Sequence, residues 1–441
     1  MSPTRTMAQL PSARGAPVVG NTLRWLRRPL DTPVQAHRTH GDVFRYDIFF
    51  QRPVVFAHPD AIGRILTDPD GDLSTARGWE PFFGRLMKGG LLLRDHDDHR
   101  SHRSLMRGAF SSSALQGYLD VMTPRIEARI DAWIDRGEVV LLPEVQRLLL
   151  ELAGVSLLGV EAPDELDRLI RAFEAIARGV MGLVGVPLPG TALARGLRAR
   201  ADLSRFLKER IAARRKAPGP DLTSQLCSAT DEHGAVLTDE EIVDHVIFLW
   251  MAAHDTTTGS AVMAAYELAR HREWQDRLRE EALGLPDRLD VQTSAQATQA
   301  GWVIHETLRL YPPIGSIPRR TLRQTTIADV VLPADTPLRA AILLLHRHPE
   351  VWTDPERFDP ERFAEPRQEH RRHRHAFRPF GTGAHACLGM RLAQLQLHAM
   401  LHHLMRHARL RLPDDYVLKL SPAPSLRPAD GLPLRLQRVP R

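Results

Sequence analysis

The sequence predicts a mostly α-helical protein with a small β-rich portion near its N-terminus. From about residue 97 onward, apolar residues recur every three or four positions over several long segments, which is the spacing of helices with one buried face. Before that point, 42–50 and 53–58 are short runs rich in β-branched and aromatic residues, a pattern typical of strands. No obvious linker divides the 441 residues, so we expect one domain spanning residues 1–441.

The helical pattern is clearest in the segments that follow residue 97. Apolar residues at helical spacing occur in 122–134, 145–158, 165–177 and 193–215. An apolar loop, 181–188, separates the last two of these segments. This loop either lines an opening for apolar ligands or packs on the body of the protein.

Composition argues against several classes of protein. The formal net charge is +6, but the arginines are scattered without interleaved aromatic residues, so we expect no nucleic-acid partner. No apolar run approaches the roughly 18 residues that a membrane span needs, and the N-terminus lacks the apolar core of a signal peptide. With two cysteines, Cys227 and Cys387, the chain has no disulfide framework, and we expect a cytoplasmic protein.

The longest predicted helix runs from Thr238 to about His271 and would span on the order of 50 Å. Thr238 and Glu241 form a capping-box pattern at its start. The centre is apolar on most faces, yet it contains Asp255 followed by three threonines, and a buried carboxylate is costly without partners. This conflict marks either a functional site or a carboxylate paired with an arginine beside threonines that bond to the preceding turn.

The second unusual segment surrounds Cys387. This cysteine lies among the glycines 381, 383 and 389, where a long helix is predicted to begin. Orphan backbone amides and the positive end of the helix dipole favour a thiolate there, and glycines leave room for a large flat group. One axial thiolate without a second Cys or His ligand at metal spacing describes an iron already held by four other atoms, which indicates haem.

The residues around Cys387 also match a family signature. The segment 380–389, FGTGAHACLG, has every fixed position of F-x-x-G-x-[RH]-x-C-x-G, and the chain therefore resembles a cytochrome P450. The resemblance implies haem b with Cys387 as iron ligand, Phe380 beside the sulfur, His385 at a haem propionate and Gly389 as the last position of the signature. It also implies the cytochrome P450 fold, with haem between the long central helix and the helix that follows the cysteine.

Further family blocks occur in the expected order. Glu306 and Arg309 resemble the E-x-x-R block, whose spacing puts both side chains on one helix face. Arg362 is the implied third member of a buried brace behind the haem. Taken without the other motifs, Glu306 and Arg309 would be an ordinary surface pair.

Two blocks are implied to bind the haem propionates. His99 and Arg103 resemble the H-x-x-x-R block, whose spacing directs two donors at one carboxylate. Arg319 resembles the strand arginine that binds the other propionate, with its neighbour Arg320 as the alternative by one position. A surface position for Arg319 is the other interpretation.

The centre of the long helix resembles the oxygen-binding segment of the family. Residues 252–257 match A-G-x-[DE]-T-T except that Ala253 stands where Gly is usual. By resemblance, Thr256 positions oxygen and water above the iron, and Asp255 relays protons to them. These two are the predicted catalytic residues.

The resemblance places the substrate above the iron, in a pocket that is mostly apolar. The segments assigned by position are 79–93 and the loop 181–188, together with Phe248, Ala252, Ile314, Ile317 and Leu426. Each of these residues could equally be plain core. The sequence looks like the sub-group that handles retinoids, sterols and similar lipids, so we expect an apolar substrate of lipid, retinoid, sterol or terpenoid type.

The implied reaction is insertion of one atom of O2 into the substrate, with electrons from a separate ferredoxin and an NAD(P)H-dependent ferredoxin reductase. The basic run 370–375 is either a solvated surface or the docking face for an acidic ferredoxin. A peroxide-driven or isomerising relative is one alternative, against which Asp255 and Thr256 argue. A non-catalytic haem-binding sensor or carrier is the other.

Overall fold

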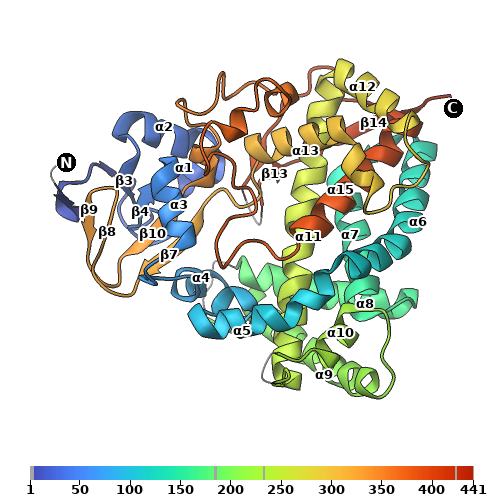
Figure 1. Cartoon of the computed structure of the whole chain (residues 1–441), viewed down its shortest axis with the longest axis horizontal. Coiled ribbons are helices and arrows are strands. Elements are labelled where there is room, and N and C mark those ends of the chain that lie inside the picture. Colours follow the sequence, from blue (N-terminus) through green and yellow to red (C-terminus); the bar gives the residue numbers. More distant parts are fainter. Residues whose placement is uncertain (1–3, 183–185, 232–233, 423–424, 441) are drawn as a thin grey trace.

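The fold consists of a large helical part and a smaller β-rich part, with the N-terminus in the β-rich part and the C-terminus in the helical part (Figure 1). The structure, a computed structural model, describes residues 4–182, 186–231, 234–422 and 425–440. Helices dominate after residue 95 and most short strands belong to the smaller part. The predicted fold class is therefore confirmed.

Most helices of the large part follow the predicted periodicity. The four segments predicted from apolar spacing fall within α6, α7, α8 and α9 and are confirmed. The helices of this part are α5 His96–Met106, α6 Ser112–Arg136, α7 Leu141–Leu158, α8 Pro163–Val180, α9 Ala192–Lys216, α10 Leu222–Ser228, α11 Asp239–Arg270, α12 Arg272–Leu283, α13 Thr298–Leu310 and α15 Met390–His407.

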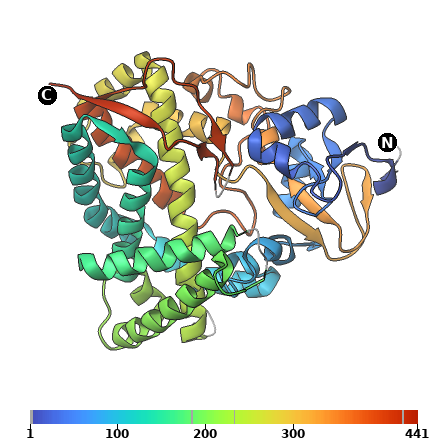
Figure 2. The ribbon, with the colours of Figure 1, turned by 180° about the vertical axis from the view of Figure 1, so that it is seen from behind.

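The helix α11 is the axis of the helical part. It begins after Thr238, whose hydroxyl accepts from the Glu241 amide, while the Glu241 carboxylate accepts from the Thr238 amide at 2.9 Å. Both bonds of the predicted capping box are thus present, and the predicted length is confirmed. The helix α11 runs the height of this part in both views (Figure 2) and contacts α7, α13 and α15. Its middle is therefore enclosed by protein.

The β-rich part is built around a six-stranded sheet in the order β2-β3-β4-β10-β7-β5. The two predicted strand runs form the antiparallel pair β3 and β4. The next strands in the sheet, β10 beside β4 and then β7, come from the second half of the chain. The sheet therefore ties the N-terminal segment to the region before the cysteine. The strands are β2 Ser12–Ala13, β3 Val43–Tyr46, β4 Val54–Phe56, β5 Leu73–Ser74, β7 Ile317–Thr321 and β10 Pro337–Ala340.

Four short helices precede residue 97, where only strands and loops were expected. They are α1 Thr22–Arg27, α2 Asp31–His40, α3 Pro59–Thr67 and α4 Ala76–Phe83. The helix α3 buries Ile62, Ile65 and Leu66 in the cluster that also contains the sheet residues Val54 and Leu338. Such short helices depend on tertiary packing more than on their own periodicity, so the pattern in the sequence did not reveal them.

The remaining elements are small. The further strands are β1 Arg5–Thr6, β6 Glu138–Val140, β8 Thr325–Ile327, β9 Val330–Leu332, β11 Ala408–Arg411, β12 Leu420–Ser421, β13 Arg427–Pro428 and β14 Pro433–Arg438, and α14 is Ile342–Leu345. The 3-10 turns are Met7–Gln9, Leu91–Leu93, Arg107–Phe110, Thr293–Gln296, Pro360–Phe363 and Glu369–Arg371. Among the described residues, no helix is both long enough and apolar enough to cross a membrane.

Candidate functional site

The loop before α15 holds Cys387 in a defined turn. The Cys387 amide donates to the carbonyl of Phe380 at 2.8 Å. The helix α15 begins at Met390, so the helix predicted to start at the cysteine starts three residues later, after Gly389. Gly381 has a φ of 70°, which favours glycine, and a Cβ there would make an ordinary contact with the His385 carbonyl oxygen at 3.8 Å.

Position 383 requires glycine for a reason other than the expected clearance for a cofactor. Its φ of 73° favours glycine, and a Cβ there would lie 2.5 Å from the carbonyl oxygen of Leu66. The missing side chain therefore allows the cysteine loop to pack against α3, where we had expected clearance for a cofactor.

The Cys387 side chain is exposed, although burial among surrounding groups is the largest influence on its pKa and raises it. A thiol that is both accessible and poorly solvated faces an internal space. The Gly389 amide and the Arg103 guanidinium lower the pKa of this thiol, although burial has the larger effect. Coordination to a metal deprotonates such a thiol outright, so the donor fits an iron ligand.

Two arginines and two histidines from three separate segments lie near this thiol. The rings of His99, in α5, and His385, in the cysteine loop, lie 3.7 Å apart between centroids. Arg103 follows His99 by one helical turn. Arg319, in β7, is 4% exposed and acts electrostatically on both histidines.

The mutual effects of these groups are large. Burial and then Arg103 lower the pKa of His99 to about 4, and burial and then His99 lower that of His385 to about 2. Burial lowers the pKa of Arg319 to about 10. These shifts describe two histidines that stay neutral beside arginine charges in poorly solvated surroundings.

Among the described residues, no carboxylate forms an ion pair with the arginines of this cluster, although Asp95 acts on His99 and Arg319 from a distance. Arg319 donates to the Pro318 carbonyl at 2.8 Å. The Nδ1 atom of His99 is buried without a hydrogen-bond partner. An arginine charge in poorly solvated surroundings needs an anion, and the two carboxylates of haem b would supply it beside the thiol. The residues present therefore fit this cofactor.

The sequence left open which of two neighbouring arginines, Arg319 or Arg320, points toward the cysteine loop. Its guanidinium pairs with Asp335 at 2.9 Å and is partly exposed, whereas Arg319 is buried. Neighbouring residues of a strand point to opposite faces. Arg319 is thus the one of the two that approaches the histidine pair.

On α11, exposure in the middle of a buried helix marks the residues that face the internal space. Ala252 is exposed and Thr256 is half-buried. The Thr256 hydroxyl donates to the Ala252 carbonyl at 2.8 Å. This is the bond to the preceding turn that one of the two interpretations of the threonines predicted. This bond keeps the hydroxyl on the same helix face as Ala252.

Asp255 lies beside this face and is 8% exposed. Burial raises the pKa of its carboxyl group to about 6, while Arg427 acts in the opposite direction. The Nδ1 atom of His254 lies 3.3 Å from its Oδ1, and burial lowers the pKa of His254 to about 4. Asp255 is therefore a carboxyl group that titrates near neutrality and has only weak compensation.

Glu306, Arg309 and Arg362 form a buried brace. The Glu306 carboxylate accepts two bonds from Arg309, at 2.7 and 2.8 Å, and one from Arg362 at 3.0 Å. All three side chains are fully buried, which rules out an ordinary surface pair. Arg309 also donates to the carbonyl oxygens of His346 and Pro355, so the brace ties α13 to the segments around the cysteine loop.

Three functional neighbours were missed in the sequence. Glu369 accepts from Arg362 at 2.8 Å and extends the brace. Arg427 is the charged group that acts on Asp255, and the Ser425 hydroxyl donates to the Asp255 carbonyl at 3.1 Å. Each depends on contacts between distant segments, and none carries a local signal.

The proposed pocket residues vary in their surroundings. Ala252 is exposed, Ile314 is 40% exposed, Phe248 and Ile317 are half-buried, and Leu426 is buried. In the loop 181–188, residues 183–185 lie outside the described residues. Val186 and Leu188 are both 56% exposed, so the described end of this loop does not pack closely on the body.

Comparison with known proteins agrees with this geometry. The family model for cytochrome P450 matches residues 10–431. A protein named cytochrome P450 136 from Mycobacterium tuberculosis is 37% identical over 96% of this chain and 87% of its own length. The pentalenene oxygenase of Streptomyces avermitilis is 31% identical over 92% of each chain.

A solved structure gives the same result for the fold. Retinoic acid-bound cyanobacterial CYP120A1 superposes with a TM-score of 0.89 at 27% identity, covering 98% of this chain and 99% of the other. The similarity extends over both the helical and the β-rich part.

Proposed function

Since the chain belongs to the cytochrome P450 family and is therefore a haem-thiolate monooxygenase, we propose that it oxidises an apolar small molecule with electrons from a separate ferredoxin. Haem b, bound through a cysteine thiolate, supplies the activation of O2, of which one atom passes to the substrate. The substrate is of lipid, retinoid, sterol or terpenoid type. The solved relative that holds retinoic acid and the relative named pentalenene oxygenase support this class.

The protein contributes the cofactor site. Cys387 is the proposed iron ligand, and the Gly389 amide holds its sulfur. His99, Arg103, Arg319 and His385 are the proposed partners of the haem carboxylates, because they are cationic or neutral donors without a carboxylate partner among the described residues. Glu306, Arg309 and Arg362 fix the position of the segments behind the cofactor.

On the opposite side, α11 contributes proton delivery. Below a pH of about 6 the buried Asp255 carboxyl holds a proton, which it can pass toward the internal space. Because the Thr256 hydroxyl donates to the Ala252 carbonyl, its proposed role is to accept a hydrogen bond there and so to orient the group that receives the proton. This pair favours a monooxygenase over a peroxide-driven or isomerising enzyme, which has no need of a relay.

The substrate is proposed to lie over Ala252, with Phe248, Ile314, Ile317 and Leu426 around it. These side chains are apolar and offer burial without directional bonds, so they select for size and shape rather than for polar groups. The same surroundings exclude water from the reaction.

The proposed electron donor is an acidic ferredoxin, reduced by an NAD(P)H-dependent reductase in the cytoplasm. Arg371 and Arg374 are exposed and form no ion pair in the part of the chain that the structure describes. They lie directly before the cysteine loop, and a negative partner would approach the cofactor along this route.

The observation that carries the proposal is the set of two arginines and two histidines beside the Cys387 thiol, in a chain that also places an acid and an alcohol in the middle of α11. The test is a screen of apolar compounds for displacement of water from ferric iron in the purified holoprotein. Each hit is then incubated with ferredoxin, reductase, NAD(P)H and isotopically labelled O2. One labelled oxygen atom in the product is expected.

The alternatives give different results in this assay. Product formed with hydrogen peroxide but never with the ferredoxin system would indicate a peroxide-driven enzyme. A rearranged product without labelled oxygen would indicate an isomerising enzyme. Ligand binding without any product would indicate a haem-binding sensor or carrier.

A further inference from the structure

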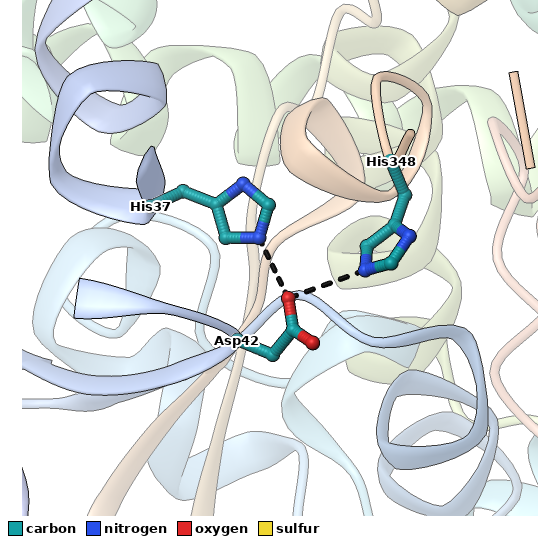
Figure 3. A group of neighbouring side chains, drawn as sticks. All are labelled: His37, Asp42 and His348. Carbon is teal, nitrogen blue, oxygen red and sulfur yellow. Dashed lines mark hydrogen bonds and ion pairs between the residues drawn. The ribbon is translucent and has the colours of Figure 1, made fainter. Parts of the chain in front are cut away.

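A second cluster of potential ligands lies in the β-rich part. His37 in the last turn of α2, Asp42 just before β3 and His348 after α14 turn toward one another (Figure 3). The Nε2 atom of His37 lies 2.7 Å from Asp42 Oδ1, and the Nε2 atom of His348 lies 3.2 Å from the same oxygen. Each residue thus directs one ligand atom at a common point.

The spacing suits a tetrahedral metal ion. The three ligand atoms all lie within 4.8 Å of one another, and among the described residues no other group of three His, Cys, Asp or Glu does so. Zinc binds imidazole nitrogen and carboxylate oxygen at about 2.0–2.2 Å, which places neighbouring ligand atoms roughly 3.3 Å apart. The two nitrogen–oxygen distances, 2.7 and 3.2 Å, are shorter than that value, so the side chains would move apart slightly to admit an ion.

The backbone holds these side chains in place without a metal. The Gly41 amide donates to the His37 carbonyl at 2.8 Å, and its φ of 77° turns the chain back so that Asp42 faces His37. The Asp42 carbonyl accepts from the Ala57 amide in the sheet at 2.9 Å. The His348 side chain is 3% exposed and its amide donates to Leu345. The ligands are therefore preorganised by three independent segments.

Charge and access also suit a cation. Asp42 supplies a carboxylate, a group with a negative charge that a divalent cation binds. Both histidines bond to Oδ1, and the other carboxylate oxygen has no hydrogen-bond partner within the described ranges. The Asp42 side chain is 35% exposed, which leaves one side open to water as a fourth ligand.

We propose that His37, Asp42 and His348 bind a divalent transition-metal ion of the zinc type, completed by water. Two nitrogen ligands exclude Mg²⁺ and Ca²⁺, which prefer oxygen throughout, and favour Zn²⁺. The ion would join α2 to the turn after α14. Two residues before His348, the His346 carbonyl accepts from Arg309 of the brace, so the site stabilises the segment that supports the cofactor loop. This site is independent of the proposed reaction.

The test uses the haem-loaded protein after treatment with a chelator that leaves haem in place. Zn²⁺ is titrated calorimetrically into the parent, His37→Gln and Asp42→Asn. Loss of either ligand should weaken the tightest site by roughly tenfold or more. At the zinc X-ray absorption edge, where haem iron does not contribute, the parent with one equivalent of Zn²⁺ should show two imidazole ligands.

Two matched variants make the result specific. His40→Gln removes a histidine from the same helix, and His403→Gln removes one member of the pair formed with His407, whose rings lie 4.4 Å apart. Both should keep the parent affinity at the tightest site. The proposal is overturned if His37→Gln binds Zn²⁺ as tightly as the parent, or if His403→Gln alone loses the site. The haem absorption spectrum should be the same in all variants, so failure here leaves the monooxygenase assignment untouched.

Discussion

Asp255 keeps a carboxyl group inside the helical part with little compensation from its neighbours. Burial raises its pKa from the ordinary 3.8 to about 6, and Arg427 opposes this only in part. Because the folded pKa is the higher one, the ionised form is disfavoured in the folded protein. Folding stability therefore falls as the pH rises from about 4 to about 6, and the penalty is complete above that range.

The same titration governs proton delivery. The parent should form product fastest when Asp255 is protonated, and its coupled turnover should decline as the pH rises through about 6. Asp255→Asn cannot titrate, so it should turn over more slowly, lose this pH dependence and show a larger solvent isotope effect. Initial rates across the pH range in light and heavy water measure all three. A variant with the parent's pH profile would remove Asp255 from the relay.

Thr256 offers a separate test at the same site. In Thr256→Ala, oxygen and NAD(P)H should still be consumed, but more should leave as hydrogen peroxide and less as product, because the hydroxyl that orients proton delivery is gone. The measurement is the ratio of product formed to NAD(P)H oxidised with saturating partners. Ser260→Ala removes a hydroxyl that donates to the Thr256 carbonyl at 2.9 Å and serves as control. If Thr256→Ala keeps the parent ratio, the hydroxyl is structural.

The helix α13 and the 3-10 turn Pro360–Phe363 contain the residues of the brace. Glu306 is fully buried between two arginines, and its removal leaves Arg309 without a carboxylate partner, while Arg362 keeps Glu369. Such a loss costs about 3–5 kcal/mol in a buried pair, whereas an exposed pair is worth about 1 kcal/mol or less. The brace therefore contributes more to folding stability than a surface pair with the same spacing in the sequence would.

Glu306→Gln should lower the free energy of unfolding by about 3–5 kcal/mol and reduce the fraction of protein that retains haem. Denaturant unfolding, with the haem content of the purified protein, measures both effects. Glu361→Gln is the matched control, since Glu361 pairs with Arg277 at 2.7 Å but is half exposed. Equal stability of the two variants would contradict a structural role for the brace.

The elements that could be predicted are those with local signals. The start of α11 was predictable because Thr238 and Glu241 satisfy each other within one turn, and the cysteine loop because its signature is contiguous. The helices α1 to α4 were not predictable, since they are short and depend on the sheet. Arg427 was missed as a partner of Asp255 because only the tertiary fold brings β13 beside α11.

At the scale of the whole molecule, the cysteine loop follows a basic surface. Arg371, Arg372 and Arg374 are all exposed, but they differ in their partners. Arg372 donates to the Val351 carbonyl at 2.8 Å and to the Thr353 hydroxyl at 3.0 Å, so it has a structural role. Arg371 and Arg374 are therefore the better candidates for contact with an electron donor.

Charge reversal of Arg371 and Arg374 should slow reduction by ferredoxin and weaken its dependence on salt, because surface charges act on encounter and are screened over about 8 Å at physiological ionic strength. Substrate binding should not change. Stopped-flow reduction at several salt concentrations measures the effect. Arg168→Glu, at an exposed position on α8, is the control. An unchanged reduction rate would make the basic run an ordinary solvated surface.

The most direct measurement is the absorption spectrum of the reduced carbon monoxide complex. The parent should show the long-wavelength band that is diagnostic of thiolate ligation. Cys387→Ser should lose this band, because a hydroxyl replaces the thiol that faces the internal space, whereas Cys227→Ser should retain it. A band that persists in Cys387→Ser, or disappears in Cys227→Ser, would contradict the assignment of Cys387 as the iron ligand.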